Sequence, residues 1–186
     1  MIQLGISAFY HDSSACIVQD GKVLAAVEEE RFTGIKHDSG FPINAINWCL
    51  RSTRSTLHGI DQICWYENPK LKKKRVINSF NKHPLRTLFH RINYLLDYNK
   101  QNPEKILRKG GFRGDIVYTD HHLSHAAFSY YTSPYQNAAI LTIDGVGESE
   151  TTTISKADKN NIKKIYSANF PNSLGLLYST ITAFLG

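Results

Sequence analysis

The stretch Ile2–Glu29, IQLGISAFYHDSSACIVQDGKVLAAVEE, contains the module on which the fold is built. Short apolar runs alternate with polar residues at a period of two, and an Asp-Gly pair separates two of the runs. This pattern predicts three strands joined by a polar turn and then by a hairpin. In chain order the predicted parts are Ile2–Ser7, the turn Phe9–Ser14, Ser14–Gln19, the hairpin turn Asp20-Gly21, and Lys22–Glu29.

The same order of elements returns after Pro134. The second copy is predicted to contain strands at Ala138–Asp144, Glu150–Lys156 and Ile162–Phe170, with a glycine turn at Gly145–Gly147 and a helix from Ser173 to Leu185. Two such modules describe the actin/hexokinase/Hsp70 (ribonuclease H-like) architecture, in which each lobe contributes one phosphate-binding turn. We therefore expect an α/β protein whose mixed sheet is flanked by helices.

The first copy and the segment that follows it are expected to form a first lobe, which spans residues 1–133. Phe41-Pro42 opens a helix, and Ile60–Tyr66 and Asp115–Thr119 read as strands. Residues 70–114 form a basic insertion with amphipathic helices at Leu71–Phe80 and Pro84–Tyr98. Residues 134–186 are then the start of a second lobe, which we expect to be incomplete.

Composition indicates an ordinary globular chain, with 41% hydrophobic and 20% charged residues in 186. The N-terminal MIQLGIS has no basic region and no apolar run, so no secretory signal is expected. No stretch approaches the roughly 18 apolar residues that a membrane span needs. The three cysteines, Cys16, Cys49 and Cys64, form no Cys-x-x-Cys pair and read as buried thiols. We expect a cytoplasmic protein without a membrane span.

The net charge of +6 is concentrated in one segment. Glu67–Arg113 contains thirteen Lys and Arg against three acidic residues, whereas the rest of the chain carries a charge of −4. Basic residues interleaved with aromatic ones could contact RNA or a phosphorylated ligand. The alternative is a solvated helical cap, which we favour because no RNA-binding signature is present. On that view nucleic acid is not a partner and the Lys72–Arg75 cluster is dispensable.

The stretch Thr119–Tyr131, TDHHLSHAAFSYY, concentrates histidines at a predicted helix start. With Thr119 or Asp120 as the N-cap, His121 and His125 share one helix face. Together with Asp144, at the end of a predicted strand, they form a set typical of a divalent metal. The alternative is a helix start that uses histidines as polar caps and core residues. His122 points roughly 100° away from this face.

Two further polar stretches could carry chemistry. The amides near Ser13 and Ser14 could bind phosphate oxygens, and His11 with Asp12 could handle a proton. The alternative is a polar turn without a ligand. The charged stretch from Glu28 through His37 is expected to be a solvated surface.

Several motifs, in order, resemble the N-terminal domain of the O-carbamoyltransferases that act on nodulation factors, cephamycins and aminoglycosides such as tobramycin. The motifs are GISAFYHDSSACIVQDGKVLAAVEEERFTGIKHD from Gly5, DHHLSHAAFSYY from Asp120, LTIDGVGE from Leu141 and FPNSLGLLYS from Phe170. The resemblance covers the chain apart from the basic insertion and Lys156–Ala168.

The resemblance implies a two-step reaction, a bound metal and a set of site residues. A C-terminal adenylate-forming domain makes carbamoyl-adenylate from carbamoyl phosphate and ATP, and the N-terminal domain transfers the carbamoyl group to a hydroxyl of a small-molecule or sugar acceptor. The implied metal is iron(II), ahead of manganese or magnesium. The implied site consists of the metal ligands His121, His125 and Asp144, the general base His11, and the nucleotide-binding residues Asp12, Ser13, Lys36, Asp144, Gly145 and Gly147.

Two expectations concern what lies outside this stretch of sequence. The family's last metal carboxylate and its adenylate-forming domain are expected beyond Gly186, so the chain alone is expected to be inactive. Apolar side chains of Ile140, Leu141 and Ile143 would then be exposed and favour self-association. Two other functions remain open: an RNA-binding relative of the tRNA threonylcarbamoyl transferases, which share the His-x-x-x-His pair, and a non-catalytic nucleotide-binding lobe.

Overall fold

The computed structural model describes residues 1–81 and 88–186, without the side chains of residues 80, 81, 88–91, 93 and 94. The chain divides into two compact units, and each is described by itself. Unit 1 contains residues 1–66 and 92–118, and unit 2 contains residues 67–91 and 119–186. The boundary expected at residue 133 concerns a complete two-lobed fold and stays a prediction.

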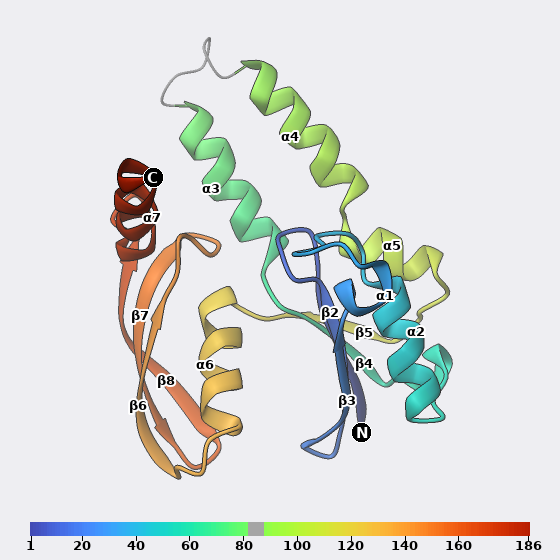
Figure 1. Cartoon of the computed structure of the whole chain (residues 1–186). Helices are drawn as coiled ribbons and strands as arrows, with labels where there is room; N and C mark the ends of the chain where they lie inside the picture. The colour runs from blue at the N-terminus through green and yellow to red at the C-terminus, as the bar shows by residue number, and fades with distance from the viewer. Residues whose placement is uncertain (82–87) are drawn as a thin grey trace. The chain divides into compact units, whose positions relative to one another are not determined.

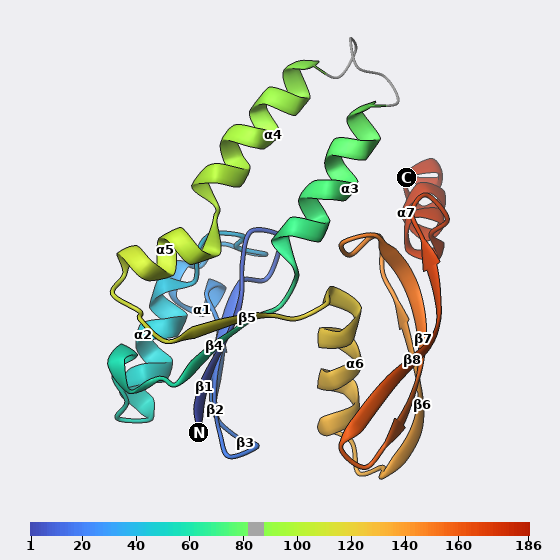
Figure 2. The ribbon, with the colours of Figure 1, turned by 180° about the vertical axis from the view of Figure 1, so that it is seen from behind.

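Unit 1 is built on a five-stranded mixed sheet in the order β3-β2-β1-β4-β5 (Figures 1 and 2). The first three strands are antiparallel neighbours, whereas β1, β4 and β5 run parallel. Parallel neighbours require crossover connections, which the helices of this unit supply. The strands are β1 (Ile2–Ser7), β2 (Ser14–Gln19), β3 (Lys22–Glu28), β4 (Gln62–Trp65) and β5 (Asp115–Tyr118).

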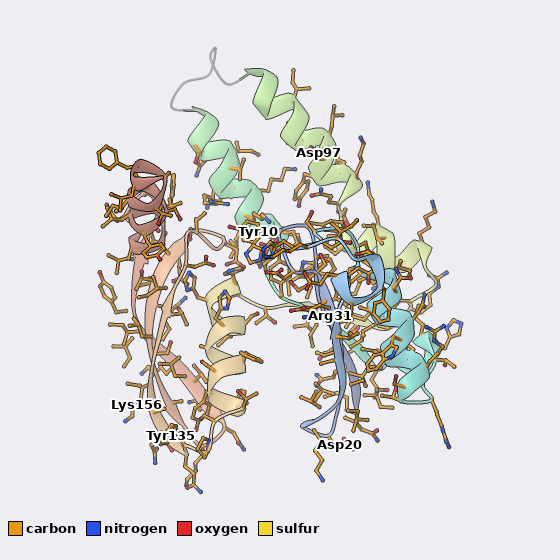
Figure 3. All side chains as sticks on the ribbon, viewed as in Figure 1. Tyr10, Asp20, Arg31, Asp97, Tyr135 and Lys156 are labelled. Atoms are coloured by element: carbon orange, nitrogen blue, oxygen red, sulfur yellow. The ribbon has the colours of Figure 1, made fainter. Side chains whose placement is uncertain are left out.

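The Asp-Gly turn between β2 and β3 has the predicted conformation. Asp20 has a φ of 49° and Gly21 a φ of 79°, and two positive φ values in a two-residue loop match the twist of a hairpin. Asp20 lies at the tip of this hairpin (Figure 3), where its carboxylate pairs with the N-terminal amine at 2.6 Å. The first predicted module is thus confirmed.

The core of unit 1 follows from the alternation in its strands. Leu4 and Ile6 on β1 are buried on the face that α2 and α5 help to cover. This face brings together Ala15, Ile17, Ile63, Trp65, Ala45, Ile46, Cys49, Leu107 and Phe112. The helices of the unit are α1 (Glu30–Thr33), α2 (Ile43–Ser52), a 3₁₀ turn at Leu57–Gly59, and α5 (Pro103–Lys109).

The helices of the basic insertion differ in part from the expectation. The predicted Leu71–Phe80 helix is α3 (Pro69–Asn81), and the second is α4 (Leu88–Lys100), whose predicted start at residues 84–87 lies outside the described residues. The structure adds α5, which sequence reasoning missed. Its signals are local: the Asn102 side chain accepts a hydrogen bond from the Lys105 amide, and Pro103 occupies the first turn.

The charged stretch from Glu28 to Arg31 was expected to be a solvated surface, and the structure corrects this expectation for Glu29. Glu29 is only 3% exposed. Its carboxylate accepts hydrogen bonds from the Asn44 amide at 3.2 Å, the Asn44 side chain at 2.7 Å and the Ala45 amide at 2.8 Å. Because Pro42, at the N-cap of α2, makes no side-chain cap, Glu29 satisfies this helix end instead.

Unit 2 contains an antiparallel three-stranded sheet in the order β6-β7-β8, as the second module predicted. Helix α6 packs on this sheet through Ala126 and Tyr130, which meet Ile140 and Ala157 in a small core (Figure 1). The elements are β6 (Asn137–Ile143), β7 (Glu150–Asp158), β8 (Asn161–Asn169), α6 (His121–Tyr131) and α7 (Leu174–Leu185). Helix α3 completes the unit.

The apolar surface of unit 2 is arranged differently from the expectation. Ile140 is buried beneath α6, so only Leu141 and Ile143 of the three expected residues are exposed. Helix α7 has no buried residue, and its large apolar side chains include Phe184, which is 87% exposed.

None of the helices within residues 1–81 and 88–186 combines the length and apolar character needed to cross a bilayer.

The Glu29 cap generates a stability prediction. Glu29→Ala should lower the free energy of unfolding by about 2–4 kcal/mol, because it leaves buried amides of α2 without their charged acceptor. Glu28→Ala is the matched control, since Glu28 is more exposed and pairs with Arg31 at 3.2 Å. That control should cost less than about 1 kcal/mol. Urea unfolding of both variants measures the difference, and equal losses would contradict the assigned cap.

Candidate metal centre

The N-terminus of α6 is capped by a residue distant in sequence. Asp120 occupies the predicted N-cap position, but its side chain makes no cap hydrogen bond. Instead Glu148, which is 5% exposed, accepts from the His121 amide at 3.0 and 3.1 Å through its two carboxylate oxygens. The same carboxylate accepts from the Asn68 amide at 2.6 Å. Glu148 therefore joins the starts of α6 and α3 to the loop after β6.

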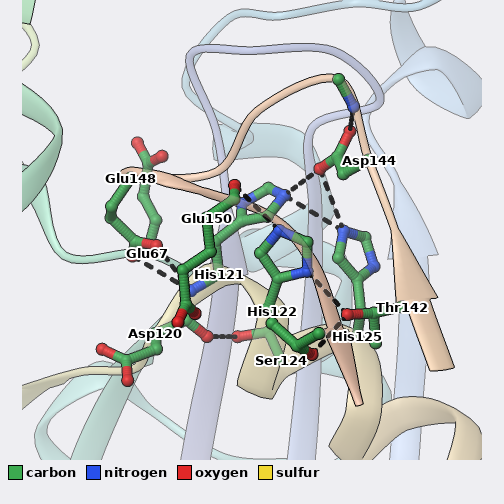
Figure 4. Close-up of polar contacts among 12 residues, drawn as sticks. Glu67, Asp120, His121, His122, Ser124, His125, Thr142, Asp144, Glu148 and Glu150 are labelled. Atoms are coloured by element: carbon green, nitrogen blue, oxygen red, sulfur yellow. Dashed lines mark hydrogen bonds and ion pairs between the residues drawn. The ribbon is translucent and has the colours of Figure 1, made fainter. Parts of the chain in front are cut away.

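His121, His125 and Asp144 come together as predicted, with both imidazoles turned toward one carboxylate (Figure 4). Asp144 Oδ2 lies 2.6 Å from His121 Nε2 and 3.6 Å from His125 Nε2. The two Nε2 atoms are 3.1 Å apart. The four-residue spacing on α6 places the imidazoles on one face, and the end of β6 brings the carboxylate opposite them.

This arrangement fits a divalent metal. Two ligand atoms held about 2.1 Å from one ion, at angles of about 90–120°, are about 3.0–3.6 Å apart. The distances of 3.1 and 3.6 Å lie within this range, and the 2.6 Å contact needs to open by only a few tenths of an ångström. Two imidazole nitrogens and one carboxylate oxygen also suit a first-row transition metal and leave other coordination positions open.

The protonation of Asp144 agrees with such a role. Hydrogen bonds from His121 and then His125 hold the pKa of the Asp144 carboxyl well below its usual range, although burial opposes this shift. The carboxylate is therefore ionised at neutral pH, which is the form that binds a cation.

His122 has a separate structural role. Its Nδ1 lies 2.6 Å from Thr142 Oγ1, which lies 2.7 Å from Thr153 Oγ1, and its Nε2 lies 3.0 Å from the Glu150 carbonyl oxygen. The carbonyl can only accept, so Nε2 donates to it and Nδ1 accepts from Thr142. Burial lowers the pKa of His122, and the Glu150 carbonyl opposes that shift. A neutral imidazole thus joins α6 to β6 and β7.

The glycine turn after β6 is shaped by close contacts. A Cβ on Gly147 would lie 3.1 Å from Cβ and Cδ2 of His121, and a Cβ on Gly175 would lie 2.5 Å from the Asp144 carbonyl. Small residues here let the loop approach the imidazole and let α7 approach the loop. The Gly145 amide donates to Asp144 Oδ1 at 2.6 Å and the Gly147 amide to the Glu150 carbonyl at 2.9 Å. Both amides expected to bind phosphate are therefore engaged within the loop.

In unit 1 the predicted residues His11 and Asp12 form a second polar cluster, joined by His37. The Asp12 carboxylate lies 2.6 Å from His11 Nδ1 and 2.8 Å from His37 Nδ1. Hydrogen bonds from His37 and His11 lower the pKa of Asp12. In a neutral imidazole, an Nδ1 that donates to this carboxylate leaves Nε2 as an acceptor. Asp12, Glu30 and His37 also place ligand atoms close enough for a cation.

Ser13 and Lys36 lie on either side of this cluster in the sequence. Ser13 is fully buried, and its amide donates to the Asp38 carbonyl at 2.8 Å, so this amide is not available to a phosphate. Lys36 is exposed in the turn beside His37. The nucleotide-binding roles expected of both residues stay predictions.

Sequence reasoning missed the partners of the site. Glu148, Thr142 and His37 were not selected, although each contacts a predicted histidine or Asp12. For Glu148 a signal existed: a helix start without a capping bond of its own needs an acceptor, and Glu148 is the carboxylate that follows the glycine turn. No local pattern pointed to Thr142.

Comparison with known proteins shows which sequences the chain resembles. The family model for the carbamoyltransferase N-terminus matches residues 2–186. An uncharacterised protein of Synechocystis, sll1178, is 39% identical over 98% of the chain and 32% of its own length. The nodulation protein NolNO of Sinorhizobium fredii is 33% identical over 97% of the chain and 26% of its own length. An uncharacterised protein of Methanocaldococcus jannaschii, MJ1051, is 26% identical over 95% of the chain.

The chain spans between a quarter and a third of the length of these relatives, 32% of sll1178 and 26% of NolNO. The match to the family model includes both the histidine helix and the loop that carries Asp144 and Glu148. The chain therefore belongs to the carbamoyltransferase family, as the resemblance of its motifs indicated, and corresponds to the N-terminal part of that family's proteins.

Proposed function

We propose that this chain is the acceptor-carbamoylating part of a metal-assisted O-carbamoyltransferase. The observation that carries the proposal is the convergence of His121, His125 and Asp144 in a chain matched along its length by the carbamoyltransferase N-terminus. The donor is carbamoyl-adenylate, made from carbamoyl phosphate and ATP by a separate adenylate-forming domain. The acceptor is a hydroxyl of a small molecule or sugar.

The reaction balances as an acyl transfer. The acceptor oxygen attacks the carbamoyl carbon, the new carbon–oxygen bond forms, and the bond from that carbon to the phosphate oxygen breaks to release AMP. The acceptor proton passes to His11 Nε2, the acceptor nitrogen that remains when Asp12 holds Nδ1 at 2.6 Å. Asp12 also stabilises the imidazolium that results, since it remains ionised.

Iron(II) is the proposed metal, ahead of manganese and magnesium, because two imidazoles and one carboxylate form the ligand set. When bound, the ion supplies positive charge that polarises an oxygen of the donor. The residues of the chain prepare this role: Asp144 is held ionised, and Glu148 fixes the start of the helix that carries both imidazoles.

The repeat of one module supports the proposed actin-like architecture. The antiparallel meander β6-β7-β8 repeats the strand order and pairing of β1-β2-β3. In the proposal, carbamoyl phosphate, ATP and the adenylate-forming domain are the partners of this chain.

The ligand set predicts the effect of removing each histidine. His121→Ala and His125→Ala should each lower bound metal at least about tenfold, because each variant removes one of three ligands. His122→Ala should keep most of the metal, since that imidazole binds Thr142 and Glu150 instead. Metal analysis of the purified proteins by mass spectrometry measures this. Equal metal loss in all three variants would contradict the ligand assignment.

The role of His11 predicts a separation of two steps. In the protein with its adenylate-forming domain, His11→Asn should lower carbamoyl transfer about 10²–10⁴-fold, the usual range for losing a general base. Formation of carbamoyl-adenylate should be unchanged. Pyrophosphate release measures formation of carbamoyl-adenylate, and acceptor-dependent release of AMP measures the transfer.

His58→Asn is the matched control for this substitution, because His58 is also an exposed histidine of unit 1. It should leave both rates intact. A His11→Asn variant that transfers normally, or that loses both steps together, would rule out the proposed base.

A further inference from the structure

Unit 2 contains a cavity formed between one face of α3 and the ends of β7 and β8. Its volume is about 390 Å³, which is within the range of small-molecule sites. From α3 come Leu71, Lys74, Arg75, Asn78 and Ser79, at the spacing of one helical stripe. The opposite wall consists of Ser149 and Phe170.

The cavity is lined by groups that recognise an anion beside a flat apolar surface. Lys74 supplies an ammonium and Arg75 a guanidinium, which bind phosphate and carboxylate by charge-assisted hydrogen bonds. Asn78 and Ser149 add amide and hydroxyl groups, and Ser79 adds a hydroxyl that donates to the Arg75 carbonyl and can still accept. Phe170, which is 39% exposed, supplies an aromatic ring. None of the described residues that line the cavity is acidic.

The charges around the cavity strengthen this preference. Lys72 on the same helix pairs with Glu67 at 2.8 Å, so the acidic residue that precedes α3 is engaged outside the cavity. Helix α3 itself carries five basic residues, Lys70, Lys72, Lys73, Lys74 and Arg75, and no acidic one. An anionic ligand is therefore attracted to this face of unit 2.

The cavity is also connected to the candidate metal centre through the loop after β6. Glu148 bonds to the His121 amide and to the Asn68 amide, immediately before α3. The next residue, Ser149, lines the cavity, and its carbonyl accepts from the Phe170 amide at 2.9 Å. One short loop thus contributes Asp144 to the metal ligands and Ser149 to the cavity wall.

We propose that this cavity binds the acceptor of the carbamoyl group, and that the acceptor is a sugar-like molecule bearing an anionic group such as phosphate or carboxylate. Arg75 and Lys74 bind the anion, the polar side chains bind hydroxyls, and Phe170 packs against the apolar face of the ring. The assignment as acceptor rests on the proposed function, whereas the preference for an anionic ligand rests on the cavity alone. It replaces the expectation that the Lys72–Arg75 cluster is dispensable.

The test compares glucose 6-phosphate with glucose as probes, by calorimetric titration of the full chain. Glucose 6-phosphate should bind at least about tenfold more tightly than glucose, and the difference should shrink as salt is raised. Arg75→Gln combined with Lys74→Gln should abolish this preference. Lys70→Gln is the matched control, since Lys70 lies on the same helix but outside the cavity, and it should keep the preference.

Two further experiments distinguish an acceptor site from a nucleotide site, and the proposed cavity from the proposed metal centre. If AMP competes with glucose 6-phosphate and loses the same affinity in the double variant, the cavity belongs to the nucleotide and the acceptor assignment is overturned. His125→Ala should lose metal yet keep glucose 6-phosphate binding, so failure at the metal centre is distinguishable from failure at the cavity. Equal binding of glucose and glucose 6-phosphate would overturn the anionic cavity itself.

Discussion

The buried carboxylate of Glu148 is the constraint on which the geometry of unit 2 depends. It accepts hydrogen bonds from the first amide of α6 and from the Asn68 amide that precedes α3. A charged acceptor at a helix N-terminus is favourable because it satisfies orphan amides and complements the helix dipole. Because Glu148 lies four residues after Asp144, one short loop contacts both the amide and the imidazole of His121.

Around this contact, unit 2 is organised by polar side chains as much as by apolar ones. Its apolar core is small, with Ala126, Tyr130, Ile140 and Ala157. A line of hydrogen bonds from Thr153 through Thr142 to His122 and the Glu150 carbonyl joins the sheet to α6. Each group in that line has a partner of the right kind, and a fully satisfied network fixes one orientation of a helix better than apolar contact alone. The loop that carries Asp144 is thus supported from two sides.

The sequence was sufficient for the parts of this arrangement that are local. Period-two alternation and the Asp20-Gly21 turn located β1 to β3, and the four-residue spacing of His121 and His125 placed them on one face. The contacts that the sequence could not predict are tertiary ones, between residues far apart in the chain. Glu29 looked like a surface charge because its acceptor role depends on α2, fourteen or more residues later in the chain. Likewise, the roles of Glu148 and Thr142 depend on tertiary contacts with histidines of α6.

The three residues of the candidate centre differ in their access to water, and this difference has a kinetic consequence. The side chain of His121 is 8% exposed and that of Asp144 is 21% exposed, whereas that of His125 is 56% exposed. For the ion proposed above, His125 is the ligand that solvent reaches first, so rotation of that one imidazole would open the site without unfolding α6. Occupancy would then follow the free concentration of the ion, and a chelator would remove it from the folded protein.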